Sequence, residues 1–170
     1  MSVLDVIQKR YSVRKYLDKA VEEDKLERVL EAARLAPSAS NRQIWRFVVV
    51  RDPEVRKALA AAAGQPFVGE APIVIAGCAA DTTRVMRCGV PCHIVDLAIA
   101  LEHIALQAVA EGLGTCWIGA FDQEAAKAAI GAPEHVQIVE LMPLGYPATE
   151  MPPKSRHPLG DIVMYDRWHE

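Results

Sequence analysis

The 170-residue sequence lacks the motifs by which many enzymes are identified. It has no GxSxG nucleophile elbow and no HExxH zinc motif. It also has no GxGxxG dinucleotide loop, because Gly112-Leu113-Gly114 is not followed by a third glycine. Any phosphate group would therefore have to be held by side chains. Basic charge is not in excess either: the net charge is -3, which argues against the broad basic face of a nucleic-acid-binding protein.

Long hydrophobic runs are scarce as well. The longest strongly apolar run, Ile73 to Ala80, is far too short to cross a bilayer. Asp5, Lys9 and Arg10 interrupt the N-terminal region before the apolar core of a signal peptide could form. We therefore expect a cytoplasmic protein without a membrane partner.

Cysteine is limited to four residues, which we expect to be reduced thiols in a cytoplasmic chain. Cys78 and Cys116 lie in apolar, strand-like runs and are interpreted as small core residues. Cys88, Cys92 and His93 could bind a metal or form a redox dithiol. A tetrahedral metal site needs a fourth ligand that the sequence does not clearly provide, so free thiols near a helix start are the favoured interpretation.

Positive charge is concentrated in two short segments far apart in the sequence. The first is Arg10-Tyr11-Ser12-Val13-Arg14-Lys15-Tyr16 and the second is Lys154-Ser155-Arg156. Arginines so placed could be ordinary solvated charges, as most surface arginines are. Guanidinium groups are, however, well suited to phosphate, because each offers two parallel donors and keeps its charge.

Apolar periodicity and turn residues predict a single domain, 1–170, of the α+β or α/β sandwich class. We expect helices near 3–10, 23–35, 53–64, 91–111 and 122–130, and strands near 46–51, 73–79 and 136–144. The segment 115–121 is expected to begin as a strand and to break into a loop. Loops are expected at 37–43, 65–72 and 82–90.

Two features of this pattern suggest a second subunit. The helix at 91–111 has such a broad apolar surface that it must be buried on more than one side, either in the core or against another chain. The tail after Gly145 contains apolar residues but has no core of its own. It is therefore expected to lie on another surface, plausibly that of a partner subunit.

Four segments in order, 10–16, 36–45, 112–119 and 154–156, closely resemble the nitroreductase family of FMN-dependent oxidoreductases. The resemblance implies a nitroreductase-like three-layer α/β sandwich with a central, mostly antiparallel sheet, a long central helix and an extended C-terminal tail. It also implies a homodimer with two FMN molecules at the subunit interface.

The same resemblance assigns cofactor-binding roles to individual positions. It implies that the FMN phosphate and the ribityl or pyrimidine edge are contacted by Arg10, Ser12 and Arg14, and that the phosphate clamp is completed by Lys154 and Arg156. It implies contacts to the same flavin from the partner subunit through Ser38, Asn41 and Gln43. The isoalloxazine ring would lie along Trp117, Ile118 and Gly119, with the Gly119 amide as donor to flavin N5.

The activity implied is hydride transfer from NAD(P)H to a nitroaromatic, quinone or similar electron-poor small molecule by a ping-pong mechanism. No catalytic side chain is expected, because the flavin carries the chemistry. Two departures leave the substrate class open: Ile44 stands where the family commonly has proline, and Gly64 to Pro72 leaves little room for a lid helix. The alternatives are other flavin chemistry, such as dehalogenation or enone reduction, and a non-catalytic flavin-binding or thiol/metal-sensing module.

Overall fold

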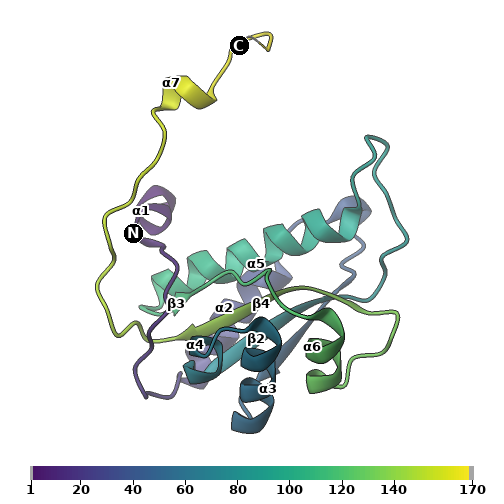
Figure 1. Cartoon of the computed structure of the whole chain (residues 1–170). Helices are drawn as coiled ribbons and strands as arrows, with labels where there is room; N and C mark the ends of the chain where they lie inside the picture. The colour runs from purple at the N-terminus through teal and green to yellow at the C-terminus, as the bar shows by residue number, and fades with distance from the viewer. Residues whose placement is uncertain (1, 169–170) are drawn as a thin grey trace.

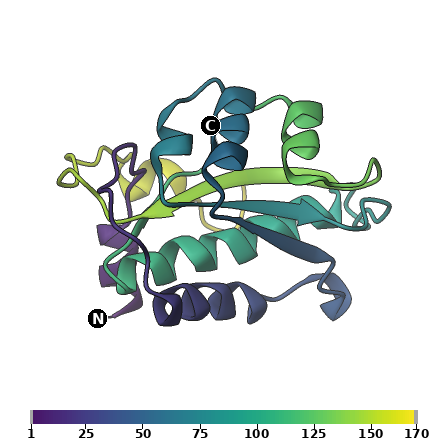
Figure 2. The same cartoon turned by 90° about the horizontal axis from the view of Figure 1, so that it is seen from below.

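Two layers of helices enclose a four-stranded antiparallel sheet in the computed structural model, which describes residues 2–168. Helices α3, α4 and α6 cover one face of the sheet, and α2 and α5 cover the other (Figures 1 and 2). The predicted α+β class and the three-layer sandwich with an antiparallel sheet are confirmed.

The sheet has the strand order β1-β2-β4-β3, with every neighbouring pair antiparallel. Its strands are β1 (Trp45–Val50), β2 (Ile73–Ala79), β3 (Gly114–Thr115) and β4 (Gln137–Gly145). Strand β2 is buried along its whole length because it lies between β1 and β4 and is covered on both faces. This explains its continuous apolar sequence, in contrast to the alternation typical of a half-exposed strand.

Residues 2–168 form seven α-helices, three of which begin at a side-chain cap. They are α1 (Val3–Lys9), α2 (Glu23–Arg34), α3 (Pro53–Ala63), α4 (Phe67–Glu70), α5 (Cys92–Ala110), α6 (Gln123–Ile130) and α7 (Leu159–Ile162). Ser2 and Asp5 form the expected capping box at α1, with the Asp5 amide donating to Ser2 Oγ at 3.2 Å. Asp52 and Asp122 cap α3 and α6 through their side-chain oxygens.

The segment 115–121 breaks from a strand into a loop as expected, and the strand within it is very short. Only Gly114–Thr115 forms a strand, followed by an isolated bridge between Ile118 and Leu141. The chain then leaves the sheet, and Gly119 and Ala120 are exposed. Periodicity could not predict the point of this departure, because β-branched and aromatic residues serve equally well in a strand and in a buried loop.

The predicted connection 65–72 contains a short helix, α4, which differs from the expectation of a loop. The Cys116 and Cys78 side chains are buried, as expected for small core residues. Trp45 is buried in the cluster between the sheet and helices α2 and α5, which confirms a packing role.

Helix α5 lies along the sheet, and its inner side is fully buried. Leu97, Leu101 and Ile104 have no exposed surface, whereas Ile94 on the same helix is 44% exposed. The helix is long and apolar enough to meet a length-and-composition test for a membrane span, and half of it is buried inside the protein. Core helices of soluble proteins meet the same test.

The tail after β4 first runs beside the segment around α1 and then extends away from the rest of the chain, where it carries α7 far from the sheet (Figure 1). All residues from 149 to 168 are exposed, including Trp168 and Leu159 at 82% and 72%. An extended tail is confirmed. Its apolar side chains are not covered by any part of the chain that the structure describes.

Candidate functional site

The two basic segments predicted from the sequence meet at the C-terminal end of α1. Residues after α1 run beside the start of the tail: Tyr16 bridges Pro147, and the Tyr11 hydroxyl donates to the Thr149 carbonyl at 2.5 Å. This pairing brings Lys154 back to α1, where its ammonium group donates to the carbonyls of Ile7 and Gln8. A cation is favourable there, since a helix exposes unpaired carbonyls at its C-terminus.

Arg10, Arg14, Lys154 and Arg156, here called the cationic cluster, act on one another and on shared neighbours. Partial burial of the Lys154 ammonium lowers its pKa, and the positive charges of Arg10 and Arg156 lower it further. Arg10 and Arg14 both act on the Cys116 thiol, whose pKa is raised by burial. Among residues 2–168, no carboxylate pairs with Arg14, Lys154 or Arg156.

Such an arrangement fits an anion. The Lys154 ammonium lies within reach of the positive charges of Arg10 and Arg156, and a dianionic phosphate would relieve the repulsion among them. The wider surface behaves differently, because arginines such as Arg28, Arg34 and Arg51 each pair with a glutamate.

Ser12 is held beside the end of β3. It forms a parallel bridge with Thr115, and the next amide, that of Val13, donates to the Thr115 carbonyl at 2.9 Å. The Ser12 hydroxyl is also a hydrogen-bond partner of Cys116 and opposes the rise in that thiol's pKa. Ser12 therefore connects the cationic cluster to the segment that contains Trp117, Ile118 and Gly119.

Trp117, Ile118 and Gly119 lie where β3 ends and the chain leaves the sheet. Ile118 is buried and exchanges two backbone hydrogen bonds with Leu141, at 3.0 and 3.1 Å. The Trp117 indole donates to Glu102 at 3.2 Å. Gly119 is exposed, and a Cβ added to it would meet nothing within 4 Å. An open space beside an accessible backbone amide fits an aromatic ring with one acceptor at its edge.

Glu102 was missed in the sequence, although it is central to this region. It lies on α5 and receives the Trp117 indole on one oxygen, while its other oxygen is 3.8 Å from Arg10 Nε. The only indication of Glu102 in the sequence was that a carboxylate stands within the broadly apolar helix predicted at 91–111. Only the fold shows that it joins the cationic cluster to Trp117.

Ser38, Asn41 and Gln43 lie on a tight loop that contains the 3₁₀ turn η1 (Ala39–Asn41). The Ser38 hydroxyl accepts from the Gln43 amide at 3.0 Å, and the Gln43 side chain donates to Asn41 Oδ1 at 3.1 Å. Ser40, Asn41 and Gln43 all have positive φ, between 52° and 54°. Strained backbone of this kind persists where the surroundings enforce it, and it is common at binding sites.

This loop lies at the other end of α5 from α1. Asp96, in the first turns of α5, accepts from the Ala39 amide at 3.0 Å and holds the loop there. Leu106 and Ala110, near the opposite end, line a cavity with Val6 of α1. Since each helical residue rises 1.5 Å, the 14 residues from Asp96 to Ala110 span about 21 Å. Within one chain, the structure does not bring Ser38, Asn41 and Gln43 to the cationic cluster.

The alternative metal or dithiol site is not formed by the described residues. His93 is buried, and its Nε2 lies 2.9 Å from Gln137 Oε1. Cys88 is exposed in a hairpin-like loop whose base is the Val85–Pro91 bridge, whereas Cys92 is buried at that base. In residues 2–168, no group of three His, Cys, Asp or Glu side chains is arranged to hold a metal ion.

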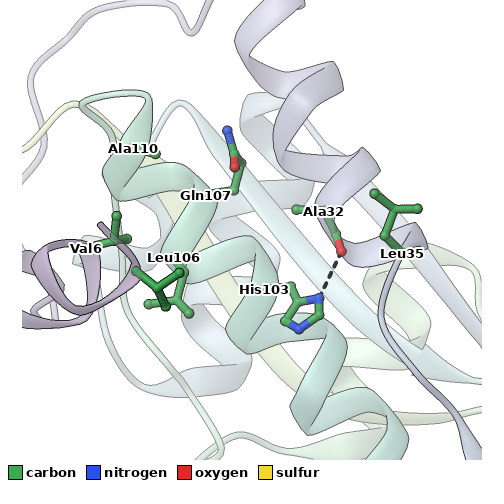
Figure 3. A pocket seen from close by; sticks show the side chains of 8 residues that line it. Val6, Ala32, Leu35, His103, Leu106, Gln107 and Ala110 are labelled. Atoms are coloured by element: carbon green, nitrogen blue, oxygen red, sulfur yellow. Dashed lines mark hydrogen bonds between the residues drawn. The ribbon is translucent and has the colours of Figure 1, made fainter. Parts of the chain in front are cut away.

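An apolar cavity of about 350 Å³ lies between α1, α2 and α5, on the side of α5 away from the sheet (Figure 3). Leu106 and Val6 line it, and the His103 ring is held at its edge by a 3.1 Å hydrogen bond to the Ala32 carbonyl. Beside it, Val3, Leu4 and Ile7 of α1 are 73%, 61% and 46% exposed. The exposed apolar surface of the chain is thus concentrated on α1, α5 and the tail.

Comparison with known proteins agrees with the motifs. The sequence model of the nitroreductase family matches residues 7–65 and 60–146. The chain is similar to an NADH dehydrogenase of Thermus thermophilus, with 37% identity over 92% of each chain. It is also similar to an FMN reductase (NAD(P)H) of Bacillus subtilis, with 30% identity over 86% of this chain and 66% of that protein.

A solved structure of a nitroreductase family protein from Clostridium difficile is 31% identical, with a TM-score of 0.87 over 99% of this chain and all of that chain. The match therefore covers sequence and fold over nearly the whole chain. The resemblance inferred from four short motifs is confirmed, and the chain belongs to the nitroreductase family.

Proposed function

We propose that this oxidoreductase binds FMN between the cationic cluster and the Trp117–Gly119 segment and uses NAD(P)H to reduce an electron-poor small molecule. The observation that carries the proposal is that Arg10 and Arg156 act on Lys154, while Glu102 joins Arg10 to the segment that ends at the exposed Gly119. The relatives with FMN or NAD(P)H in their names support the same cofactors.

The cationic cluster would bind and orient the phosphate. Arg10, Arg14 and Arg156 keep their charge at any relevant pH, and Lys154 is already positioned by the end of α1. Ser12 would add a hydroxyl donor next to them. Side chains from both ends of the chain thus replace the glycine loop that the sequence lacks.

Bound FMN would supply hydride transfer, alternately accepting and donating two electrons. The protein would position the flavin and exclude water from it. Trp117 and Ile118 provide an apolar wall, and the exposed Gly119 amide would donate to flavin N5. A ping-pong sequence follows if NAD(P)H and the acceptor occupy the same open space in turn.

We further propose that two chains form the complete site as a homodimer. The exposed apolar faces of α1 and α5 would be buried against the same faces of a second copy, and the tail would lie over that copy. Ser38, Asn41 and Gln43 of the partner subunit would then reach the flavin that this chain's cationic cluster holds. This explains why one chain keeps the two sets apart.

Anaerobic titration tests the function directly. The purified protein is mixed with FMN, separated by gel filtration, and titrated with NADH and NADPH while flavin absorbance is followed. We expect retained flavin that is bleached by at least one nicotinamide and re-oxidised by a quinone or nitroaromatic. A protein that retains no flavin would refute the proposal, and retained flavin that neither nicotinamide bleaches would indicate a binding module.

A further inference from the structure

Glu140 is a buried carboxyl in the middle of an apolar strand. It lies on β4, is 4% exposed, and its Oε1 has no hydrogen-bond partner among residues 2–168. Burial raises the pKa of Glu140 to about 9; the Ile118 backbone opposes this rise, and the charge of Glu102 adds to it. A carboxyl that is this deeply buried and has an unpartnered oxygen favours its neutral, protonated form.

The strands place this acid at the proposed flavin site. Glu140 precedes Leu141, which exchanges two hydrogen bonds with Ile118, and Gly119 directly follows Ile118. On its other side, Glu140 is in register with Gly77 of β2. A Cβ at Gly77 would come within 2.8 Å of a Leu101 methyl group, whereas the corresponding space at Gly119 is open. Glu140 is thus enclosed on its β2 side, and it lies one residue from the Ile118–Leu141 bridge that leads to the exposed Gly119.

No cation compensates an ionised Glu140. Helix α5 contributes Glu102, which is itself a carboxylate, and β2 contributes the uncharged Gly77. The segment after β3 contributes Cys116, a thiol whose pKa is raised by burial. Arg10 pairs with Glu102 at 3.8 Å, and Arg14 acts with Arg10 on the Cys116 thiol, but neither forms an ion pair with Glu140. Loss of the Glu140 proton would therefore add a second, uncompensated negative charge to the region.

We propose that Glu140 is a positioning residue for flavin reduction, whose uncharged carboxyl keeps negative charge away from the Ile118–Gly119 edge. This inference rests on the proposed function. A hydride from NAD(P)H carries two electrons and one proton to the flavin, and NAD(P)⁺ leaves. The flavin gains one negative charge until it takes a proton from solvent. A neutral neighbour tolerates that charge, and a carboxylate opposes it.

The test is the two-electron midpoint potential of FMN bound to the protein, measured from pH 6 to 10.5. Glu140→Gln is nearly isosteric and stays neutral throughout, and Glu134→Gln is the matched control at an exposed position before β4. We expect all three proteins to have parallel profiles to about pH 8. Above pH 9 the wild type and Glu134→Gln should bind reduced FMN about tenfold more weakly, relative to oxidised FMN, than Glu140→Gln does, which is about 30 mV.

The outcomes distinguish the inference on Glu140 from the proposed function on which it rests. If the wild type binds and reduces FMN but its profile equals that of Glu140→Gln, the inference on Glu140 is overturned and the function stands. If the wild type retains no FMN, both are overturned. Infrared spectroscopy gives a readout that does not need a well-folded variant at high pH. The wild type at pH 7 should show the carbonyl band of a buried, protonated acid, and its absence would also overturn the inference.

Discussion

The two helical layers of this protein differ in how completely they are finished by one chain. Helices α3, α4 and α6 bury their apolar sides on the sheet, and none of the large exposed apolar residues of the described chain lies on them. The opposite side, formed by α5 with α1 and the tail, exposes Leu4, Ile94 and Trp168. It also holds the unpaired cations and the buried Glu140. The fold alone accounts for the layer of α3, α4 and α6. The features of the opposite layer are accounted for by the FMN and the second subunit that we propose bind there.

The largest effect should come from Glu140 itself, in the unfolding of the protein as a function of pH. Burial raises its pKa in the folded protein to about 9 from the ordinary glutamate value of 4.5, so between these values the folded state holds a proton that the unfolded state releases. Stability therefore falls as pH rises through this window, by up to about 1.4 kcal/mol per pH unit. Glu140→Gln should remove this slope in urea unfolding from pH 5 to 9. An unchanged slope would show that Glu140 is ionised when folded.

The second effect concerns the proposed dimer and compares alanines on the two layers. Ala98→Glu places a charge on the outer side of α5, and Ala61→Glu places the same charge on exposed α3. A buried, unpaired charge in an interface costs about 3 kcal/mol, so Ala98→Glu should raise the dimer dissociation constant by about 100-fold. Sedimentation equilibrium should show no change for Ala61→Glu. Equal behaviour of the two variants would remove the distinction between the layers.

The third effect tests the cationic cluster. Removing one charge-assisted contact costs about 2 kcal/mol, so Arg14→Ala or Arg156→Ala should weaken FMN binding about 30-fold. Arg51→Ala removes an exposed arginine that pairs with Glu23 and serves as the control. Fluorescence titration of FMN measures all three. Unchanged affinity in both cluster variants would contradict the phosphate assignment.

The smallest effect should come from the loop at 38–43. Ser38→Ala removes the acceptor of the Gln43 amide, and Thr83→Ala removes a comparable local contact, to Asp81, in another loop. The lost hydrogen bond is worth about 1 kcal/mol, so FMN affinity should fall about fivefold in Ser38→Ala alone. If Thr83→Ala weakens binding equally, the loop at 38–43 has no special role.

Much of the fold could be predicted because its signals are local. The capping box at Ser2, the aspartates before α3 and α6, and the apolar repeat of α5 each depend on neighbours within a few residues. The point at which 115–121 breaks from strand into loop could not be predicted, for the opposite reason. Whether those residues pair with β4 beyond Ile118 depends on the path of the chain, and not on their own preferences.

The site divides in the same way. Arg10, Arg14, Lys154 and Arg156 were predicted because their motifs are contiguous, and their role in FMN binding stays a prediction. Three acidic residues were not predicted, because their roles depend on contacts between elements. Glu102 contacts Arg10 and Trp117, Asp96 contacts Ala39, and Glu140 contacts the Ile118 backbone.

The sequence by itself determined the class of fold, the family, and the residues available to hold a phosphate, since each is encoded in short runs of residue type. Only the tertiary structure decided which charged groups are paired, which are unpaired and which are buried. Arg10 lies 3.8 Å from Glu102, Lys154 is bound to the end of α1, and Glu140 is buried with one carboxyl oxygen that has no partner among the described residues. Charge in a protein depends on surroundings that come from distant parts of the chain, and folding alone brings those parts together.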